Sequence, residues 1–305
     1  SRIYNIAKKE MIGEKSSDFK DQKDLFKEAL ASDFSMSEIQ QIWRQILTHF
    51  LSISPIEQIA MGDHQFSLQE SKIIERIVER LQNKEPFQHI LGEVEFYGLE
   101  LKSDGRALIP RPETEELVDW IVEDNKGLPL RILDICSGSG CISLSLSQAF
   151  QEAQVWGYEL SKEAIELSEE NALALKLPVE FKCVNVLEDE QFTSALKNQT
   201  KLGLLDIVVS NPPYIPYCEK DSMDAVVLKH EPEMALFVPN EEPLLFYRKI
   251  AEGILPFLST CGVLYFECHY LQLENTRNLL LELGFKNVEK RKDLQGKWRM
   301  LKAQK

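Results

Sequence analysis

Apolar residues in the first third of the chain recur every three to four positions, which is the spacing of an amphipathic helix. One such run follows Ser35 and Glu38, and a second follows Ser67 and Glu70; both pairs have the Ser-x-x-Glu form of a capping box. The apolar residues of the two runs are Ile39, Ile42, Trp43, Ile46 and Leu47, then Ile73, Ile74, Ile77, Val78 and Leu81. These signals predict a helical N-terminal domain over residues 1–84, led by a loose polar tail.

The pattern changes in residues 85–110, where aromatic and polar residues alternate. Glycines at positions 92, 98 and 105 interrupt this stretch at turn-like intervals. Alternation between glycines is typical of β-hairpins. We therefore expect one or two hairpins here, which form a linker between domains.

Residues 111–305 alternate between short apolar runs and helix-period runs, which is typical of a parallel sheet covered by helices. The predicted strands are 131–136, 155–159, 179–184, 206–210, 262–267, 285–290 and 297–301. The predicted helices are 141–150, 162–175, 244–255 and 271–283. The fold class is therefore expected to be α/β.

Composition and charge exclude several classes of protein. The 305 residues include 35 basic and 49 acidic ones, a net charge of −14, and such a chain is a poor sequence-independent binder of nucleic acid. The sequence contains no run of 18 apolar residues, so no membrane span is predicted. The first residues have no apolar signal core. Six cysteines without a Cys-x-x-Cys pair fit reduced thiols in the cytoplasm, and five scattered histidines predict no metal site.

The first candidate site is a small-residue turn between a predicted strand and a predicted helix. Its residues are Cys136, Ser137, Gly138, Ser139 and Gly140. Ligands of open α/β sheets bind at such turns, because glycine lets the backbone approach them closely. Glu159 ends the next strand, 25 positions after Asp134, where a carboxylate can accept both hydroxyls of a ribose. Helix capping is the alternative role for Glu159, and these two elements alone do not exclude NAD as the ligand.

The second candidate site follows the strand 206–210. Asn211, Pro212, Pro213 and Tyr214 form a turn in which two prolines fix the backbone and remove two N–H donors. An acceptor-rich turn of this kind suits a planar NH₂ group, whose two hydrogens the Asn211 Oδ1 and the Pro212 carbonyl accept while Tyr214 packs on its flat face. Holding both hydrogens opposes delocalisation of the nitrogen lone pair, so the nitrogen can attack an electrophile in line.

Together these motifs resemble class I S-adenosylmethionine-dependent methyltransferases, and more closely the release factor glutamine methyltransferases of the PrmC/HemK family. The resemblance covers about residues 20–305. The segments that carry it further are 85–92 (EPFQHILG), 96–98 (FYG), 108–115 (LIPRPETE) and 231–236 (EPEMAL).

The resemblance implies a Rossmann-like sheet of seven strands, parallel except for one late strand, after a helical N-terminal domain and a hairpin linker. It implies N5-methylation of the glutamine in the Gly-Gly-Gln motif of class 1 peptide chain release factors, with S-adenosylmethionine as methyl donor. By this analogy residues 136–140, Glu159 and Asn211 contact the cofactor, and Asn185 and Val186 lie beside its adenine. The glutamine amide is held by the turn 211–214.

The resemblance also implies that Arg111, Glu113 and Glu231 lie beside the substrate cleft and that the helical domain docks the release factor. We expect the protein to act as a monomer, and its net acidity disfavours direct contact with nucleic acid. Cys136 replaces the usual first glycine of the cofactor turn, and Asn185 replaces a frequent acid. A positive φ at position 136 would cost about 1 kcal/mol or more. The alternative function is methylation of adenine or guanine amino groups in DNA or RNA, because such enzymes share the Asn-Pro-Pro-Tyr turn.

Overall fold

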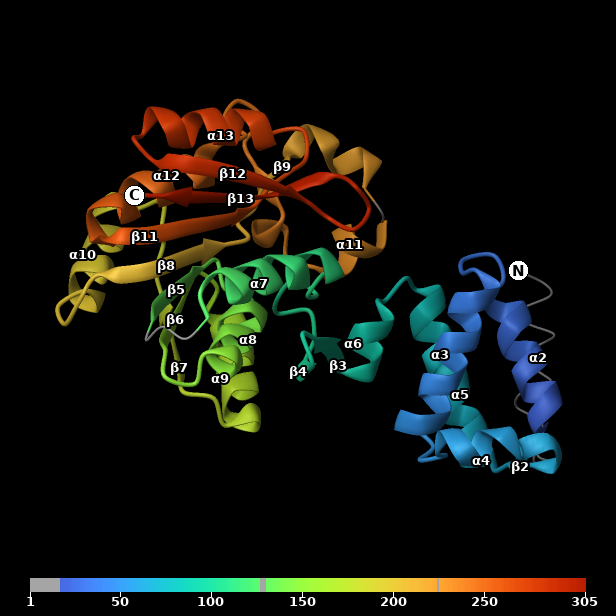
Figure 1. The fold of residues 1–305 in the computed structure, drawn as a ribbon. Coiled ribbons are helices and arrows are strands. Elements are labelled where there is room, and N and C mark those ends of the chain that lie inside the picture. The colour runs from blue at the N-terminus through green and yellow to red at the C-terminus, as the bar shows by residue number, and fades with distance from the viewer. Residues whose placement is uncertain (1–16, 127–129, 224) are drawn as a thin grey trace. The chain divides into compact units, whose positions relative to one another are not determined.

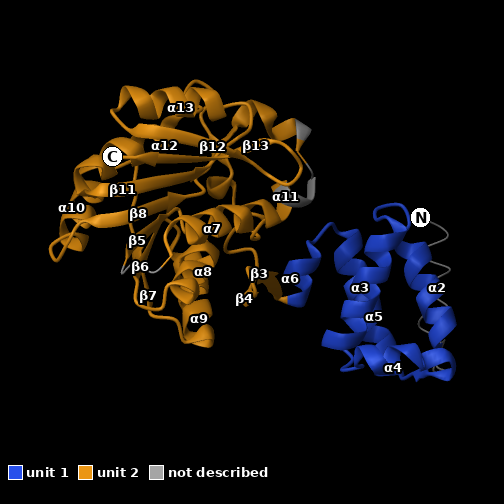
Figure 2. Cartoon of the chain, in the orientation of Figure 1, with its two compact units in different colours: residues 1–91 blue, residues 92–305 orange. Residues whose placement is uncertain are grey.

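The computed structural model describes residues 17–126, 130–223 and 225–305. The chain divides into two compact units, Ser1–Leu91 and Gly92–Lys305 (Figure 2).

The first unit is a set of helices with one short β-ribbon. Its helices are α2 (Phe19–Leu30), α3 (Met36–His49), α4 (Pro55–Ile59), α5 (Leu68–Gln82) and α6 (Phe87–Leu91). Strands β1 (Ser17–Asp18) and β2 (Gln65–Phe66) pair antiparallel, and a 3₁₀ turn spans Met61–Asp63. The two predicted capping boxes begin α3 and α5, and a third, of Ser54 with Glu57, begins α4. Each cap satisfies amide groups that the first helical turn leaves without partners.

The apolar stripes of these helices face one another and form a core of their own. Trp43 lies at its centre and contacts the rings of Phe19, Phe26 and Phe66. Ile46, Ile74 and several neighbours in α3 and α5 are fully buried. The periodic residues therefore serve packing within this unit.

The second unit contains a seven-stranded sheet in the order β12-β13-β11-β8-β5-β6-β7 (Figure 1). The strands are β5 (Arg131–Ile135), β6 (Gln154–Glu159), β7 (Val179–Cys183), β8 (Leu205–Ser210), β11 (Leu258–Glu267), β12 (Lys286–Lys292) and β13 (Trp298–Gln304). Only β13 runs against its neighbours in this sheet, β11 and β12. The predicted α/β fold, with seven strands of which one late strand is reversed, is confirmed.

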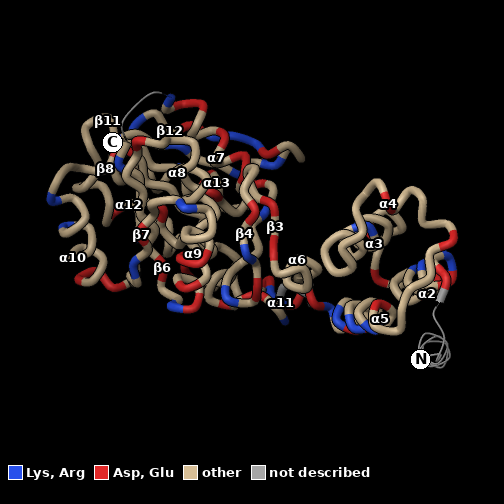
Figure 3. The backbone as a smooth tube through the Cα atoms, turned by 90° about the horizontal axis from the view of Figure 1, so that it is seen from below, with Lys and Arg blue, Asp and Glu red and all other residues tan. Residues whose placement is uncertain are grey.

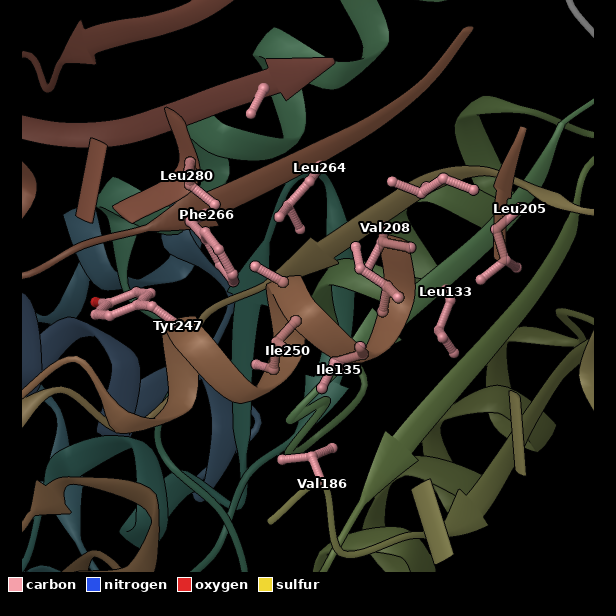
Figure 4. Packing of buried hydrophobic residues seen from close by; sticks show 14 of the residues in the cluster. Leu133, Ile135, Val186, Leu205, Val208, Tyr247, Ile250, Leu264, Phe266 and Leu280 are labelled. Atoms are coloured by element: carbon pink, nitrogen blue, oxygen red, sulfur yellow. The ribbon is translucent and has the colours of Figure 1, made fainter. Parts of the chain in front are cut away.

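Helices cover both faces of this sheet. The helices α7 (Pro112–Asp124), α8 (Cys141–Ala149) and α9 (Lys162–Leu175) pack on one face, and α10 (Asp189–Gln199), α12 (Leu245–Ile254) and α13 (Leu273–Glu282) pack on the other. Successive residues of a strand therefore serve different cores, as Ile132 and Leu133 do in β5. Figure 4 shows the core on the face that α10, α12 and α13 cover. There Leu133, Val208 and Phe266 of three strands meet Ile250 of α12.

The remaining elements are short and lie at the edges of the second unit. They are the hairpin β3 (Glu93–Phe96) and β4 (Leu99–Lys102), the ribbon β9 (Ile215–Pro216) with β10 (Phe237–Val238), α11 (Ala225–His230), and 3₁₀ turns at Tyr217–Ser222, Glu233–Ala235 and Leu255–Phe257. The Asn171 side chain on α9 accepts a hydrogen bond from the Lys102 amide, which ties β4 to the sheet domain.

The sequence pattern does not predict four of the described helices. It places a hairpin over residues 85–110, and the structure has one hairpin there, but residues 87–91 form helix α6. It predicts no element over residues 112–124, 189–199 or 225–230, which form α7, α10 and α11. The first turn of α7 is rich in acids and begins at Pro112, so it does not look helical in the sequence. Proline at the first position of a helix costs no hydrogen bond.

Candidate functional site

The predicted cofactor turn connects β5 to α8 through a left-handed backbone at three positions. Cys136, Gly138 and Gly140 have φ values of 61°, 52° and 80°. A Cβ added to Gly140 would lie 2.9 Å from the Phe181 ring, so this glycine is required by space as well as by φ. At Gly138 no heavy atom lies within 4 Å of the Cβ position, so that side of the turn is open. The turn thus exposes backbone at its middle and is packed tightly where it enters α8.

Glu159, at the end of β6, holds the turn from the side. Its Oε2 accepts a hydrogen bond of 2.9 Å from the Gly138 amide, and its Oε1 accepts from the Leu160 and Ser161 amides. Helix α9 is capped by Ser161, whose side chain accepts from the Ala164 amide. Glu159 is therefore not the cap of α9. Its half-buried carboxylate keeps about one lone pair, on Oε2, for a further hydrogen-bond donor.

Asp134 lies beneath the turn and is completely buried. Its Oδ2 accepts from the amide and hydroxyl of Ser143 at 3.1 and 2.5 Å, whereas Oδ1 has no hydrogen-bond partner among the described residues. Burial raises the pKa of Asp134 to about 7, the Ser143 hydrogen bonds oppose this shift, and the nearby charge of Glu159 adds to it. Acidic groups thus lie below and beside the turn.

The structure puts Asn185 and Val186 in the turn that follows β7. The Asn185 Oδ1 accepts from the Leu187 amide at 3.0 Å, and its Nδ2 donates to Glu188. The Val186 side chain packs in the core shown in Figure 4. A ligand beside this turn would therefore contact the Val186 backbone or the half-buried Asn185.

The turn 211–214 follows β8 directly. Ser210 ends that strand, and its hydroxyl donates to the Ile135 carbonyl of β5 at 2.6 Å. This hydrogen bond joins the ends of the two strands from which the turns 136–140 and 211–214 begin. Pro212 and Pro213 are buried, and Asn211 is half-buried. The Asn211 Nδ2 donates to the Thr114 hydroxyl at 3.4 Å.

Tyr214 also has a partner below the turn. Its hydroxyl donates to the Glu267 carboxylate at 3.3 Å, and its ring centroid lies 5.8 Å from that of His269. Burial and the neighbouring Glu267 raise the pKa of Tyr214, so the hydroxyl stays protonated. Tyr214 thus lines the site as a neutral ring with a fixed hydroxyl.

The remaining predicted residues are divided between two places. The Arg111 guanidinium pairs with Glu231 at 2.6 Å, and the other oxygen of Glu231 accepts from the Ile109 amide at 3.0 Å. Glu231 is buried, so this pair fixes the segment that leads into α7. Glu113 instead accepts a hydrogen bond from Gln295 in the β12–β13 connection. Arg111 and Glu231 therefore lie together, while Glu113 has a different partner.

Thr114 and Glu267 belong to this site but are not among the residues that the sequence predicts for it. Both are 2% exposed, and the Thr114 hydroxyl donates to Glu267 at 2.6 Å. A signal was present, because Glu267 is the acid that ends the apolar strand segment 263–267. A buried acid at the carboxyl end of a central strand is expensive unless it has partners, and so indicates a site.

Two possible features are not found. Within residues 17–126, 130–223 and 225–305, no group of three His, Cys, Asp or Glu side chains could hold a metal ion. No helix of the described chain is long and apolar enough to span a bilayer.

Comparisons with known proteins show which families this chain is similar to. The model of the methyltransferase small domain matches residues 114–228, and that of the PrmC N-terminal domain matches residues 26–92. Release factor glutamine methyltransferases from Flavobacterium psychrophilum and Bacteroides thetaiotaomicron are each 37% identical, and each comparison covers 91% of this chain and 96% of the relative. The enzyme of that name from Lactococcus lactis is 38% identical over 87% of this chain and 92% of its own length.

Among solved structures, a methyltransferase from Pyrococcus furiosus is similar with a TM-score of 0.49 and 16% identity. That comparison covers 78% of this chain and 98% of the other.

Proposed function

The chain belongs to the release factor glutamine methyltransferase family, and from this premise we propose its reaction in full. It transfers a methyl group from S-adenosylmethionine to the side-chain amide nitrogen of the glutamine in the Gly-Gly-Gln motif of class 1 peptide chain release factors. The observation that carries the proposal is the turn 211–214, which begins at the carboxyl end of β8 beside the turn 136–140.

The residues of the cofactor turn fit S-adenosylmethionine. Glu159 offers the remaining lone pair of its half-buried carboxylate to the ribose, and the open side of Gly138 lets a ligand approach the backbone. Asn185 and Val186 would border the adenine, and residues 136–140 would enclose the methionine end. When bound, the cofactor supplies an electrophilic methyl group on a sulfonium. The half-buried Glu159 carboxylate beside the turn suits its positive charge.

The turn 211–214 orients the substrate amide. Asn211 Oδ1 and the Pro212 carbonyl accept the two amide hydrogens, Pro213 stiffens the turn, and Tyr214 packs against the flat face of the carboxamide. Because a free amide nitrogen shares its lone pair with the carbonyl, holding both hydrogens out of the reactive direction makes the nitrogen a better nucleophile. The product nitrogen then loses its proton to water, so no side chain needs an unusual basicity.

Two further parts of the chain would contact the release factor. Arg111, Glu113 and Glu231 border the cleft that receives the Gly-Gly-Gln segment, and the helical unit docks the remainder of the factor. We propose that the protein works as a monomer in the cytoplasm. Asp and Glu are spread over both units (Figure 3), and the net charge of −14 disfavours a nucleic acid as the substrate.

The experiment uses Asn211→Ala, with Asn275→Ala as the matched control because Asn275 is exposed on α13. Each protein is incubated with methyl-labelled S-adenosylmethionine and a release factor. The Asn211 variant should lose at least about a hundredfold in turnover, similar to the loss of one preorganised hydrogen-bonding group at a reacting centre. The control should retain wild-type turnover.

Two substrates test the assignment itself. A release factor whose Gly-Gly-Gln glutamine is replaced by alanine should receive no label, and duplex DNA and ribosomal RNA should receive none. Label on nucleic acid but not on the release factor would favour the amino-group methyltransferase alternative. Wild-type turnover by the Asn211 variant would refute the role of the turn.

A further inference from the structure

A buried carboxylate joins the two ends of the turn 211–214. Glu267 is 2% exposed at the end of β11, and each of its oxygens accepts one hydrogen bond from a different element. Oε2 accepts from Thr114 of α7 at 2.6 Å, and Oε1 accepts from Tyr214 at 3.3 Å. Thr114 in turn accepts from Asn211 at 3.4 Å. The chain of bonds therefore runs from Asn211 through Thr114 and Glu267 to Tyr214.

The chemistry of these groups gives the chain a single direction. The Thr114 hydroxyl donates its one hydrogen to Glu267, so that hydrogen points away from Asn211. The Thr114 oxygen then presents lone pairs to Asn211 and can be approached only by a donor. Asn211 must turn its Nδ2 toward Thr114, which leaves Oδ1 on the other side of its carboxamide.

We propose that Thr114 and Glu267 are positioning residues that hold the Asn211 carboxamide with Oδ1 directed to the substrate amide. This inference rests on the proposed function. With the carboxamide reversed, Asn211 would present a second donor to the substrate's N–H hydrogens, and its oxygen would face the lone pairs of Thr114. Both contacts would be repulsive, so one buried acid determines whether the turn accepts or repels an amide nitrogen.

Glu267 is held in place from several sides. Burial raises the pKa of Glu267 above its ordinary value, and the charge of Glu113 adds to this shift. The Thr114 hydrogen bond, the Arg299 guanidinium of β13 and the Tyr214 hydrogen bond oppose it. The Tyr247 hydroxyl of α12 donates to the Glu267 backbone carbonyl at 3.3 Å, which fixes the strand end. Four donors and charges from four elements therefore converge on this residue, as expected for a group whose orientation matters.

The experiment compares Thr114→Val, which removes the hydroxyl at nearly constant volume, with Thr114→Ser, which keeps it. Thr200→Val is the matched control, because the Thr200 hydroxyl donates only to its own helix, at Leu196. The measurements are the single-turnover rate on a release factor, the KM for that factor, the dissociation constant of S-adenosylmethionine and the melting temperature.

We expect the Thr114→Val rate to fall about 10- to 100-fold, as for the loss of a contact that orients a reacting group. The KM, the cofactor affinity and the melting temperature should stay close to those of the Thr200→Val control, because the hydroxyl touches neither the cofactor turn nor the docking surface. The serine variant should recover most of the rate.

Three results would overturn the inference. They are a wild-type rate for Thr114→Val, a rate loss matched by equal losses of stability and cofactor affinity, and a serine variant as slow as the valine variant. In all three the wild-type protein still labels the release factor, so the proposed function survives. Absence of label from the wild-type protein would overturn the proposed function, and this inference with it.

Discussion

At the scale of single residues, Cys136 is a side chain in a backbone conformation that suits glycine. Its φ of 61° lies in the left-handed region, so Cys136 adopts the backbone conformation of the glycine that it replaces in the cofactor turn. For a residue with a Cβ this conformation costs about 1 kcal/mol or more. The cost is tolerated because the flanking positive-φ positions, Gly138 and Gly140, remain glycine.

Comparing alanine with glycine at position 136 isolates the free-energy cost of the positive φ, because both variants lack the thiol. We predict that Cys136→Gly is more stable than Cys136→Ala by about 1 kcal/mol, the reverse of the usual order of the two residues. Chemical denaturation measures the difference. An alanine variant as stable as the glycine variant would show that position 136 bears no strain.

Asp134 should make stability depend on pH. Its pKa rises from an unfolded value near 4 to about 7 in the folded protein, so the folded state holds a proton that the unfolded state has lost in that window. Stability therefore falls as pH rises from about 4 to about 7, and the full penalty is present above that range. Asp134→Asn removes the titration while its oxygen still accepts from Ser143.

We predict that the free energy of unfolding of Asp134→Asn, relative to wild type, rises by about 2 to 4 kcal/mol between pH 4 and pH 8. Urea unfolding without cofactor at the two pH values measures it. A difference that does not change with pH would contradict a raised pKa at this carboxyl.

At the scale of elements, the packing between β6 and β7 positions the cofactor turn. A Cβ on Gly157 would lie 2.4 Å from the Phe181 ring and 2.9 Å from the Ser137 hydroxyl. Gly157 therefore allows Phe181 to lie under the turn that contains Ser137. A residue in the middle of a strand thus controls a loop at the strand's end.

Gly157→Ala should destabilise the protein by about 1 to 3 kcal/mol, because Phe181 or the turn must move. It should also weaken S-adenosylmethionine binding. Gly62→Ala is the control, since nothing lies within 4 Å of its added Cβ. Thermal unfolding and calorimetric titration measure the two effects. An unchanged affinity for S-adenosylmethionine in the Gly157 variant would show that the Phe181 packing does not position the cofactor turn.

Elements with strong local patterns could be predicted from the sequence, whereas others depend on distant partners. The strands of the central sheet and helices α3 and α5 have clear periodicity and caps. Helix α10 buries only Phe192, Leu196 and Gln199, which is too weak a pattern to predict a helix alone. Its formation depends on packing against α12, a contact that no local pattern reveals.

At the scale of the whole molecule, each unit has a core that shares no residue with the other. The core of the first unit is centred on Trp43, and the sheet domain has its own cores on both faces. The candidate site shows the same dependence on long-range order, because Thr114, Asn211 and Glu267 come from segments up to 153 positions apart. Sequence motifs locate each turn, but only the folded sheet brings the buried Glu267 beneath the turn 211–214.

Separate cores predict separable effects of core mutations. Ile46 is fully buried in the first unit, and Ile46→Ala should destabilise that unit by about 2 to 5 kcal/mol. The rise in melting temperature that S-adenosylmethionine gives to the sheet domain should remain, while methylation of the release factor declines. Scanning calorimetry with and without cofactor measures both, and loss of the cofactor-induced rise would show that the units depend on each other for folding.

The proline pair of the turn 211–214 also determines what the site excludes. Without N–H groups, Pro212 and Pro213 cannot solvate an anion, and Glu267 lies behind Asn211, the residue that we propose faces the substrate. A glutamate has nearly the shape of a glutamine, yet its carboxylate offers no hydrogen and would meet only oxygen lone pairs. We therefore expect a release factor whose glutamine has deamidated to be rejected at this turn, so that alkylation is confined to chemically intact copies of the factor.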